Sequence, residues 1–196
     1  MPRTADAVDL EDSSCVDQLC VLEGIELHRG KVSSAGNDAN RAEALFFLGH
    51  WLGDVHQPLH VSFADDSGGN DVPVVSDFYP DDNLHSVWDT GIIRAAMDGA
   101  GWRAYADDLQ DSITAAQRTE WLGSEALDWA QESYEITLRD DVDYCERTSS
   151  RCRGEEHDRE LTADYQEIHE DVVERRLQQA GVRLAEELRR VLFSEN

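Results

Sequence analysis

The sequence predicts a mostly α-helical protein of one domain, a helical bundle interrupted by a short β-hairpin or irregular loop near residues 61–82. The chain has 196 residues, which is the length of about one domain. Apolar residues recur at steps of three and four along much of it, the pattern of helices that bury one face. We expect a disordered acidic lead-in over residues 1–14 and the helical domain over residues 15–196.

The expected helices follow from this periodicity and from the turn residues between them. They cover residues 16–32, 38–57, 83–99, 102–114, 125–138 and 162–193. Asp38 or Asn40 can cap the second helix, because short polar side chains bind the free N–H groups of a first turn. Pro58 ends that helix, since it disfavours helical geometry at the preceding residue. The apolar stripe of the second helix consists of Leu45, Leu48, Leu52 and Val55.

The last expected helix is long and has an apolar stripe of its own. This stripe consists of Tyr165, Ile168, Val172, Leu177, Leu184, Leu188 and Leu192. We expect it to pack against the other helices, because an amphipathic helix buries its apolar face. The charged stretch 140–160, which precedes the helix, lacks this pattern and is expected to be a loop.

The stretch from residue 61 to residue 82 has no helical pattern. Residues 65–69, with the sequence D-D-S-G-G, predict a tight loop, because glycine allows close approach of the backbone. Val72, Val74 and Val75 suggest a short strand, which Pro73 interrupts. We therefore expect a hairpin or an irregular loop between two helices.

The chain is strongly acidic, with 17 Lys and Arg residues against 42 Asp and Glu residues and a formal net charge of -25. This balance excludes a general electrostatic grip on nucleic acid. It leaves room for a local one, because bound metal ions can be the largest charges in a site. No signal peptide is visible in this chain, since residues 1–12 are polar and acidic. No apolar run is long enough to cross a membrane.

The four cysteines form two close pairs, Cys15 with Cys20 and Cys145 with Cys152. Neither pair has the C-x-x-C spacing of zinc or redox motifs. An even number of cysteines in local pairs favours two small disulfide loops, and hence an oxidising compartment. The alternative is four reduced thiols.

The residues that suggest chemistry lie between positions 46 and 89. His50 and Asp54 form one His-x-x-x-Asp pair, and His85 and Asp89 form another. Residues four apart lie on the same face of a helix, so each pair can direct an imidazole and a carboxylate at one point. His60 follows Pro58, where the chain can turn back toward them. These side chains are all of the ligand types that zinc prefers.

The remaining histidines receive other interpretations. A single His-x-x-x-Asp pair is usually an ordinary surface contact, but two pairs with a third histidine favour a metal site. His56 does not belong to either His-x-x-x-Asp pair. We expect it to form a hydrogen bond that orients a metal ligand without binding the metal itself. Acidic and apparently exposed surroundings argue against a role for His28, His157 and His169. Trp51 and Trp88 each adjoin a candidate ligand and are interpreted as packing walls.

Three motifs in this region carry a specific resemblance. They are F-L-G-H-W-L-G-D-V-H-Q-P-L-H at residues 47–60, D-S-G-G-N at residues 66–70 and N-L-H-S-V-W-D at residues 83–89. The chain thereby resembles the zinc-dependent, single-strand-specific type I nucleases, which include mung bean nuclease and are related in fold to zinc phospholipase C. The resemblance extends from Cys15 to the end of the chain. It implies a mainly helical, secreted or periplasmic hydrolase with three zinc ions.

The resemblance also implies substrates and roles. Single-stranded DNA and RNA would be cleaved to products with 5′-phosphates, and 3′-nucleotides would lose their phosphate; no protein partner is evident. His60, His85 and Asp89 would hold one zinc, while His50 and Asp54 would serve the other two, with Asp54 bridging. The attacking group would be a metal-bound hydroxide, with no separate catalytic side chain.

Asn70 of the Gly-Gly-Asn loop would contact the substrate by the same resemblance. The chain departs from the family pattern ahead of Cys15, where members carry an N-terminal Trp and further His and Asp ligands. We therefore expect about one complete zinc site, in a fragment, a chain with a misplaced start or a degenerate relative. The alternatives are a zinc phospholipase C-like phosphodiesterase and a catalytically inactive, metal-stabilised helical protein.

Overall fold

A computed structural model of the chain describes residues 3, 5–8, 20–80, 83–142, 144 and 159–193. The described part is mostly helical, which confirms the predicted fold class. Its α-helices are α1 (Val21–Ser34), α2 (Asp38–His56), α3 (Leu84–Ser86), α4 (Ile92–Met97), α5 (Trp102–Ser112), α6 (Ala115–Trp121), α7 (Ala126–Thr137) and α8 (Ala163–Phe193). Shorter helical turns are η1 (Pro58–Val61), η2 (Ala64–Asp66), η3 (Val87–Gly91) and η4 (Asp140–Val142).

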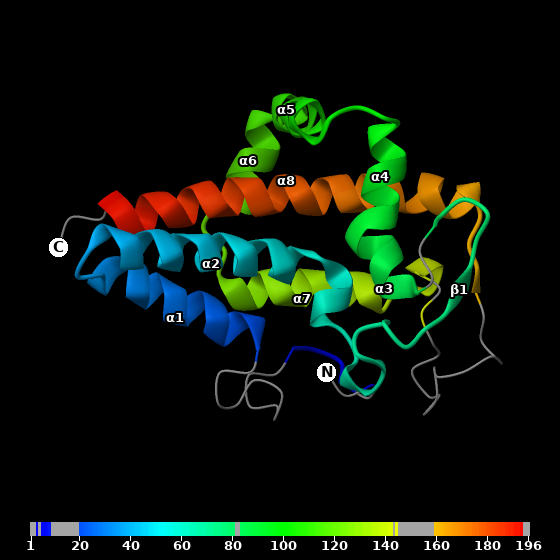
Figure 1. Ribbon diagram of the computed structural model, residues 1–196, viewed down its shortest axis with the longest axis horizontal. Helices are drawn as coiled ribbons and strands as arrows, with labels where there is room; N and C mark the ends of the chain where they lie inside the picture. The colour runs from blue at the N-terminus through cyan, green and yellow to red at the C-terminus, as the bar shows by residue number, and fades with distance from the viewer. Residues whose placement is uncertain are drawn as a thin grey trace.

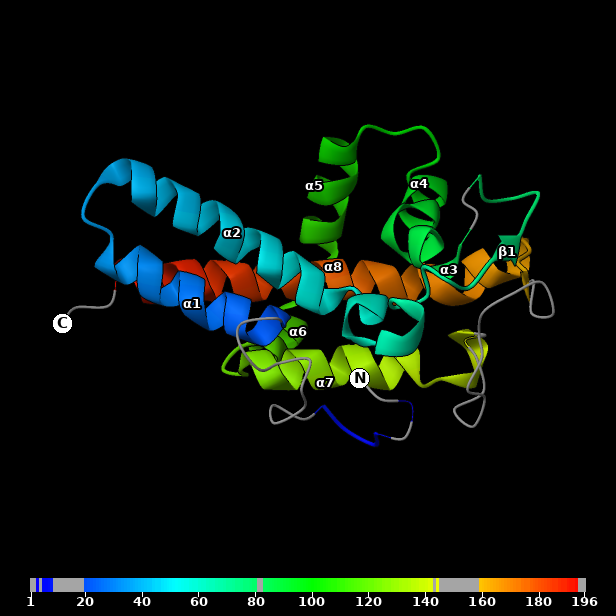
Figure 2. The same ribbon diagram turned by 60° about the horizontal axis from the view of Figure 1, so that its bottom comes forward.

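Helix α8 runs along the length of the molecule, and the other helices pack around it (Figure 1). In Figure 1, α1, α2 and α7 lie along one side of α8 and α5 lies on the other side, while α6 connects α5 to the segment that leads into α7. In Figure 2, the chain passes from the C-terminal end of α2 into the short helical turns beside α3. The core joins these layers through apolar side chains of α1, α2, α4 and α7.

Helix α2 forms where the sequence predicts a helix, but its cap differs. The N-cap residue is Asn37, whose side-chain oxygen accepts a hydrogen bond of 2.9 Å from the N–H of Asn40. The expectation of a cap at Asp38 or Asn40 is therefore wrong, because the cap lies one residue before Asp38 and three before Asn40. The helix ends at His56, two residues before Pro58, and its predicted apolar residues Leu48, Leu52 and Val55 are fully buried.

The helix predicted at residues 83–99 is a series of three helical segments, α3, η3 and α4. Asn83 caps the series by accepting a hydrogen bond of 2.8 Å from the N–H of Ser86. The middle segment, Val87–Gly91, has π-helical geometry, a rare form that occurs frequently at functional sites. Asp98 ends α4 in the left-handed conformation.

The described residues of the irregular stretch, 61–80, contain no β-hairpin. Strand β1 (Val74–Val75) instead pairs in parallel with β2 (Arg159–Glu160), which is distant in sequence. Pro73 forms an isolated antiparallel bridge with Asn83. Of the two forms expected for this stretch, the irregular loop is the one observed. A hairpin does not form because the partner strand comes from the charged stretch 140–160, which shows no strand pattern. Most of that stretch, with Cys145, Cys152 and His157, lies outside the described residues, as does Cys15.

The buried face of α8 is more polar than its sequence pattern suggests. Ile168 and Leu177 are exposed, and so is Leu192, although all three were expected to pack. The buried polar residues of α8 are Gln166, His169, Arg176, Gln179, Arg183 and Glu187. Arg176 and Arg183 reach partners on α2 and α7, and Glu187 pairs with Arg29 of α1. Gln166 and His169 bind the carbonyl oxygens of Ile92 and Asp141, so hydrogen bonding as well as hydrophobicity determines the packed face.

Three further features of the described residues concern a short helix, a cysteine and the hydropathy of the helices. Helix α6 was not expected, and Thr114 and Gln117 form a capping box at its start. Cys20 is disulfide-bonded, and the other cysteines lie outside the described residues, so neither predicted pairing is tested. None of the described helices combines the length and hydropathy needed to span a bilayer.

Candidate metal centre

The His85–Asp89 pair lies across the junction of α3 and the π-helical turn. His85 Nε2 is 3.3 Å from Asp89 Oδ2. The His50–Asp54 pair on α2 has the same geometry, with His50 Nε2 3.3 Å from Asp54 Oδ2. Both pairs therefore point an imidazole and a carboxylate at each other, as the spacing of four residues predicts.

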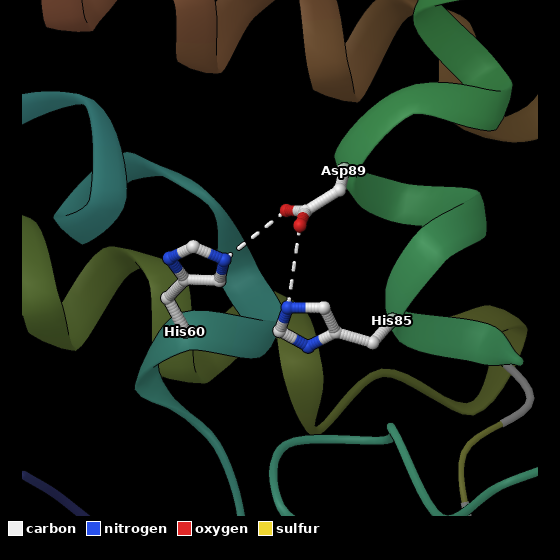
Figure 3. Close-up of side chains that lie close together, drawn as sticks. All are labelled: His60, His85 and Asp89. Carbon is white, nitrogen blue, oxygen red and sulfur yellow. Dashed lines mark hydrogen bonds and ion pairs between the residues drawn. The ribbon is translucent and has the colours of Figure 1, made fainter.

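His60 joins these two pairs. Pro58 begins the turn η1 and redirects the chain after α2, so that His60 faces the π-helical turn. His60 Nε2 lies 3.1 Å from Asp89 Oδ1, and its Nδ1 lies 3.4 Å from Asp54 Oδ1. The rings of His60 and His85 are stacked with centroids 4.9 Å apart, and both face the Asp89 carboxylate (Figure 3).

The donor atoms of His60, His85 and Asp89 all lie within 4.8 Å of one another. Two imidazole nitrogens and one carboxylate oxygen are a typical ligand set of catalytic zinc sites, which keep a fourth position open. All three side chains are partly exposed, so water or substrate can reach that position. The residues present therefore fit a zinc ion.

The hydrogen bond of the second imidazole nitrogen supports this fit. His85 Nδ1 lies 2.8 Å from the carbonyl oxygen of Gly68. A carbonyl only accepts, so Nδ1 carries the hydrogen, and in the neutral ring Nε2 has a lone pair. That lone pair faces the Asp89 carboxylate, which is also an acceptor. A cation between the two atoms removes their repulsion.

The ionisation of the cluster shows how strongly it attracts positive charge. Burial would lower the pKa of His60, but its contacts with Asp54 and Asp89 raise that pKa to about 9. Burial would raise the pKa of Asp89, but its polar contacts with His60, His85 and Gln57 hold that pKa well below its usual range. In the protein without metal, a proton on His60 thus compensates part of the carboxylate charge.

Two supporting residues were missed by the sequence interpretation. The Gln57 amide donates a hydrogen bond of 2.7 Å to Asp89 Oδ1 and so fixes the carboxylate. Gly68 supplies the carbonyl that holds His85. Both residues lie inside the quoted motifs, but nothing in their residue types indicates what they contact. Backbone and amide groups of this kind commonly orient metal ligands.

Asn70 lies at the end of the Gly-Gly turn and is exposed. Its amide donates a hydrogen bond of 2.8 Å to the carbonyl of Ser67.

Beside the metal cluster opens a cavity of about 610 Å³, bounded by residues of α1, α2, η1 and the Gly-Gly turn. Its lining includes Asp54, His60 and His85 together with Trp51 and His28. The candidate ligands therefore border an open space of the size of a small ligand.

His56 lies apart from the other candidate residues. The structure buries it, and its Nδ1 donates a hydrogen bond of 2.7 Å to the carbonyl of Leu52. Its Nε2 accepts a hydrogen bond of 2.9 Å from Arg183. Burial and the charge of Arg176 lower the pKa of His56 well below its ordinary value. The ring is thus neutral and belongs to a network in the core.

This network is centred on Glu132 of α7. Arg183 donates two hydrogen bonds of 2.7 Å to the Glu132 carboxylate. Arg176 pairs with the same carboxylate and donates a bond of 3.1 Å to the carbonyl of His56. We call Glu132, Arg176, Arg183 and His56 the arginine network.

The structure corrects the interpretation of two histidines. His28 is buried in the interface of α1 and α2, with its ring 5.1 Å from that of Phe47. His169 is also buried, between the rings of Trp88 and Tyr165. Their acidic sequence neighbours lie on other faces of the helices, which is why the local sequence suggested exposure. Trp88 is buried, as expected of a packing wall.

Comparison with known proteins places the cluster in context. The sequence matches the family described as S1/P1 Nuclease over residues 2–193. It is 34% identical to Endonuclease 2 of Arabidopsis thaliana over 166 residues, which are 81% of this chain and 55% of the relative. It is 31% identical to Endonuclease 5 of the same plant over 200 residues, or 95% of this chain and 66% of the relative.

The chain is also similar to a fungal protein. The chain is 35% identical to Nuclease P1 of Penicillium citrinum over 129 residues, which are 62% of this chain and 47% of the relative. The chain thus spans about half to two-thirds of the length of these proteins.

Proposed function

Because the chain belongs to the S1/P1 nuclease family, we propose that it is part of a zinc-dependent phosphodiester hydrolase. Its substrates are single-stranded DNA and RNA, which are cleaved to products with 5′-phosphates, and 3′-nucleotides, which lose their phosphate. The observation that carries the proposal is the convergence of His60, His85 and Asp89 on one point. The relatives described above are named nucleases or endonucleases, which supports the reaction class.

His60, His85 and Asp89 are the proposed ligands of one zinc ion. A bound zinc lowers the pKa of water to about 7 and neutralises charge on a phosphate oxygen. The protein's own groups prepare the ligands, since the Gln57 amide orients the Asp89 carboxylate and the Gly68 carbonyl orients the His85 ring. Both supports hold a ligand atom at the centre of the cluster before metal binds.

His50 and Asp54 are the proposed ligands of further zinc ions. They supply one imidazole and one carboxylate, about half of a zinc site. Asp54 also lies against His60 Nδ1, so it can orient the His60 ring at the same time. A site with two protein ligands exchanges its metal readily. We therefore infer about one tightly bound zinc per chain, with further zinc held only when it is supplied in the buffer.

The substrate is expected to occupy the cavity beside the cluster. Trp51 provides a ring surface in its lining, and unpaired bases stack on such surfaces without regard to sequence. A base inside a duplex cannot do so, which accounts for selectivity toward single strands. Asn70, on the neighbouring turn, offers an exposed amide for a substrate hydrogen bond. The net charge of -25 leaves the metal centre as the main attraction for phosphate.

A secreted or periplasmic location fits this proposal. The disulfide bond at Cys20 is of a kind that persists in oxidising compartments. Mass mapping of non-reduced peptides tests the expected Cys15–Cys20 and Cys145–Cys152 bonds. Pairing between the two halves would contradict the expected bonds, and four free thiols would contradict both the bonds and this location.

The proposal is tested by metal analysis and turnover on the same preparation. After dialysis we expect about one zinc per chain and slow cleavage of single-stranded DNA, which accelerates when zinc is added back. Duplex DNA and a phosphocholine lipid serve as control substrates, and a sample treated with a chelator serves as the metal-free control. Turnover of the lipid alone would favour the phospholipase alternative. Zinc binding without any turnover would favour an inactive, metal-stabilised protein, and absence of zinc would overturn the site.

A further inference from the structure

The carboxylate of Asp66 lies at the centre of the turn that supports His85. Asp66 is 1% exposed, although it is charged. Its Oδ1 accepts hydrogen bonds of 3.0 Å from the N–H of Gly69 and 2.6 Å from the Tyr144 hydroxyl. Its Oδ2 pairs with the guanidinium of Arg3. A buried carboxylate with three donors from different parts of the chain is a fixed point for the backbone around it.

The turn that Asp66 holds touches His85 in two places. The Gly68 carbonyl accepts a hydrogen bond of 2.8 Å from His85 Nδ1. The Gly69 carbonyl accepts one of 3.3 Å from the backbone N–H of His85. A displacement of this turn therefore changes both the position of His85 and the hydrogen bond that places hydrogen on its Nδ1.

The turn cannot keep this conformation through local preference alone. Ser67, Gly68 and Gly69 all have positive φ, at 58°, 66° and 87°. A non-glycine residue such as Ser67 pays about 1 kcal/mol or more for that conformation. Such conformations persist where surrounding contacts over-determine them. The Asp66 carboxylate supplies one of these contacts, because it binds the N–H of Gly69 from within the protein.

We propose that Asp66 is a positioning residue for the metal centre, acting through the Gly68–Gly69 turn on His85. Asp66 fixes the turn, the turn holds the Gly68 carbonyl against His85 Nδ1, and His85 thereby directs its Nε2 lone pair at the metal position beside Asp89. The proposal rests on the zinc-binding role of His85 proposed above. It gives the D-S-G-G-N motif a metal-ordering function in addition to the substrate contact expected of Asn70.

Arg3 and Tyr144 complete this support. The Arg3 guanidinium lies 4.5 Å from the centre of the Phe63 ring and 5.8 Å from that of Tyr144, so it is held between aromatic side chains. Arg3 also pairs with Asp65 at 2.8 Å. Asp65 is a matched control for Asp66, because it has the same charge and the same arginine partner. Its side chain, however, is 47% exposed.

The test compares Asp66→Ala with Asp65→Ala. Two quantities are measured: the Kd for zinc by competition with a chelator, and the 15N spectrum of the His85 ring in the metal-free protein. We expect Asp66→Ala to weaken zinc binding by about 10- to 100-fold, the usual cost of losing a group that orients a metal ligand. The 15N spectrum should show loss of the Nδ1–H form. Asp65→Ala should change the Kd by less than about threefold and leave the spectrum unchanged.

A second variant keeps the test decisive if Asp66→Ala does not fold. Tyr144→Phe removes only the hydroxyl that binds Asp66 Oδ1, and it preserves the ring packed beside Arg3. We expect a several-fold higher Kd for zinc and a partial change in the 15N spectrum of His85. A folded Asp66→Ala or Tyr144→Phe with wild-type Kd and spectrum would overturn the proposal. If the wild-type protein binds no zinc, the proposed function fails, but the His85 spectrum still decides whether Asp66 positions the ring.

Discussion

Two polar clusters lie near the C-terminal end of α2. Both contain carboxylate and histidine side chains, but they differ in the ratio of carboxylates to positively charged groups. In the metal centre, the carboxylates of Asp54 and Asp89 contact His50, His60 and His85. Among the described residues, neither carboxylate forms an ion pair with an arginine or lysine. In the arginine network, one carboxylate, that of Glu132, faces two guanidinium groups.

The difference lies in what each cluster lacks. The arginine network has its donors and acceptors paired, down to the neutral His56 that accepts from Arg183. Such a network stabilises one packing arrangement and has no need of a ligand. In the metal centre, the ligand atoms of two imidazoles and the Asp89 carboxylate lie within 4.8 Å of one another, and the Asp54 carboxylate lies beside His60. This excess of negative charge and acceptors attracts a cation. The balance of donors and acceptors therefore separates a structural histidine from a candidate ligand, where residue type does not.

The largest expected effect comes from breaking the metal centre with Asp89→Ala. Zinc-finger sites bind zinc with about 10–16 kcal/mol over four ligands, so one ligand is worth about 3 kcal/mol. Asp89→Ala should therefore weaken zinc binding by more than about 100-fold, measured by metal analysis after dialysis. The control is Asn70→Ala, which should keep its zinc and impair only substrate turnover, because an amide is a poor zinc ligand. Equal zinc loss in both variants would refute this division of roles.

The next effect comes from breaking the arginine network with Glu132→Gln. This change leaves Arg176 and Arg183, both buried, without their carboxylate. Breaking a buried ion pair costs about 3–5 kcal/mol, and we expect about 3 kcal/mol because the Glu132 side chain is 36% exposed. Denaturant unfolding measures this loss. Zinc affinity should change little, and a loss of zinc comparable to that of Asp89→Ala would show that the two clusters are coupled.

The pH dependence of stability tests whether the Glu132 ion pairs cause the difference between wild type and Glu132→Gln. Burial would raise the pKa of Glu132, but hydrogen bonds and charges of Arg183 and Arg176 lower it below the ordinary value of 4.5. A carboxylate with a lowered pKa in the folded state contributes stability that is present above pH 4.5 and is lost as pH falls through the folded pKa. The stability difference between wild type and Glu132→Gln should therefore shrink below pH 4.5. A difference that stays constant down to pH 3 would exclude the ion pair as its source.

A smaller effect on the free energy of unfolding should distinguish alanine substitutions at two glycines with similar backbone conformation. Gly68 and Gly99 both have positive φ, at 66° and 80°. A Cβ on Gly68 would lie 2.5 Å from the carbonyl oxygen of Leu59, whereas a Cβ on Gly99 would meet nothing within 4 Å. Alanine at either position costs about 1 kcal/mol for the left-handed conformation. We expect Gly68→Ala to lose about 1–2 kcal/mol more than Gly99→Ala in denaturant unfolding, by the usual cost of overpacking. Equal losses would show that the Gly68 turn is not tightly packed.

The sequence by itself determined most of the helices and the two His-x-x-x-Asp pairs. Apolar periodicity is a local property, so it located α2 and α7 to within a few residues. The spacing of four residues placed His85 against Asp89 because helix geometry alone brings them together. The same reasoning could not distinguish the π-helical turn at Asp89 from an ordinary helix.

The tertiary structure decided which residues meet across elements. His60 reaches Asp89 only because η1 and the π-helical turn pack side by side, and β1 finds its partner in a segment about 85 residues further along the chain. His56 and His60 belong to neighbouring motif positions, yet one faces Arg183 in the core and the other faces the metal centre. Hydrogen-bond partners and burial depend on contacts between distant segments, and such contacts have no local signature in the sequence.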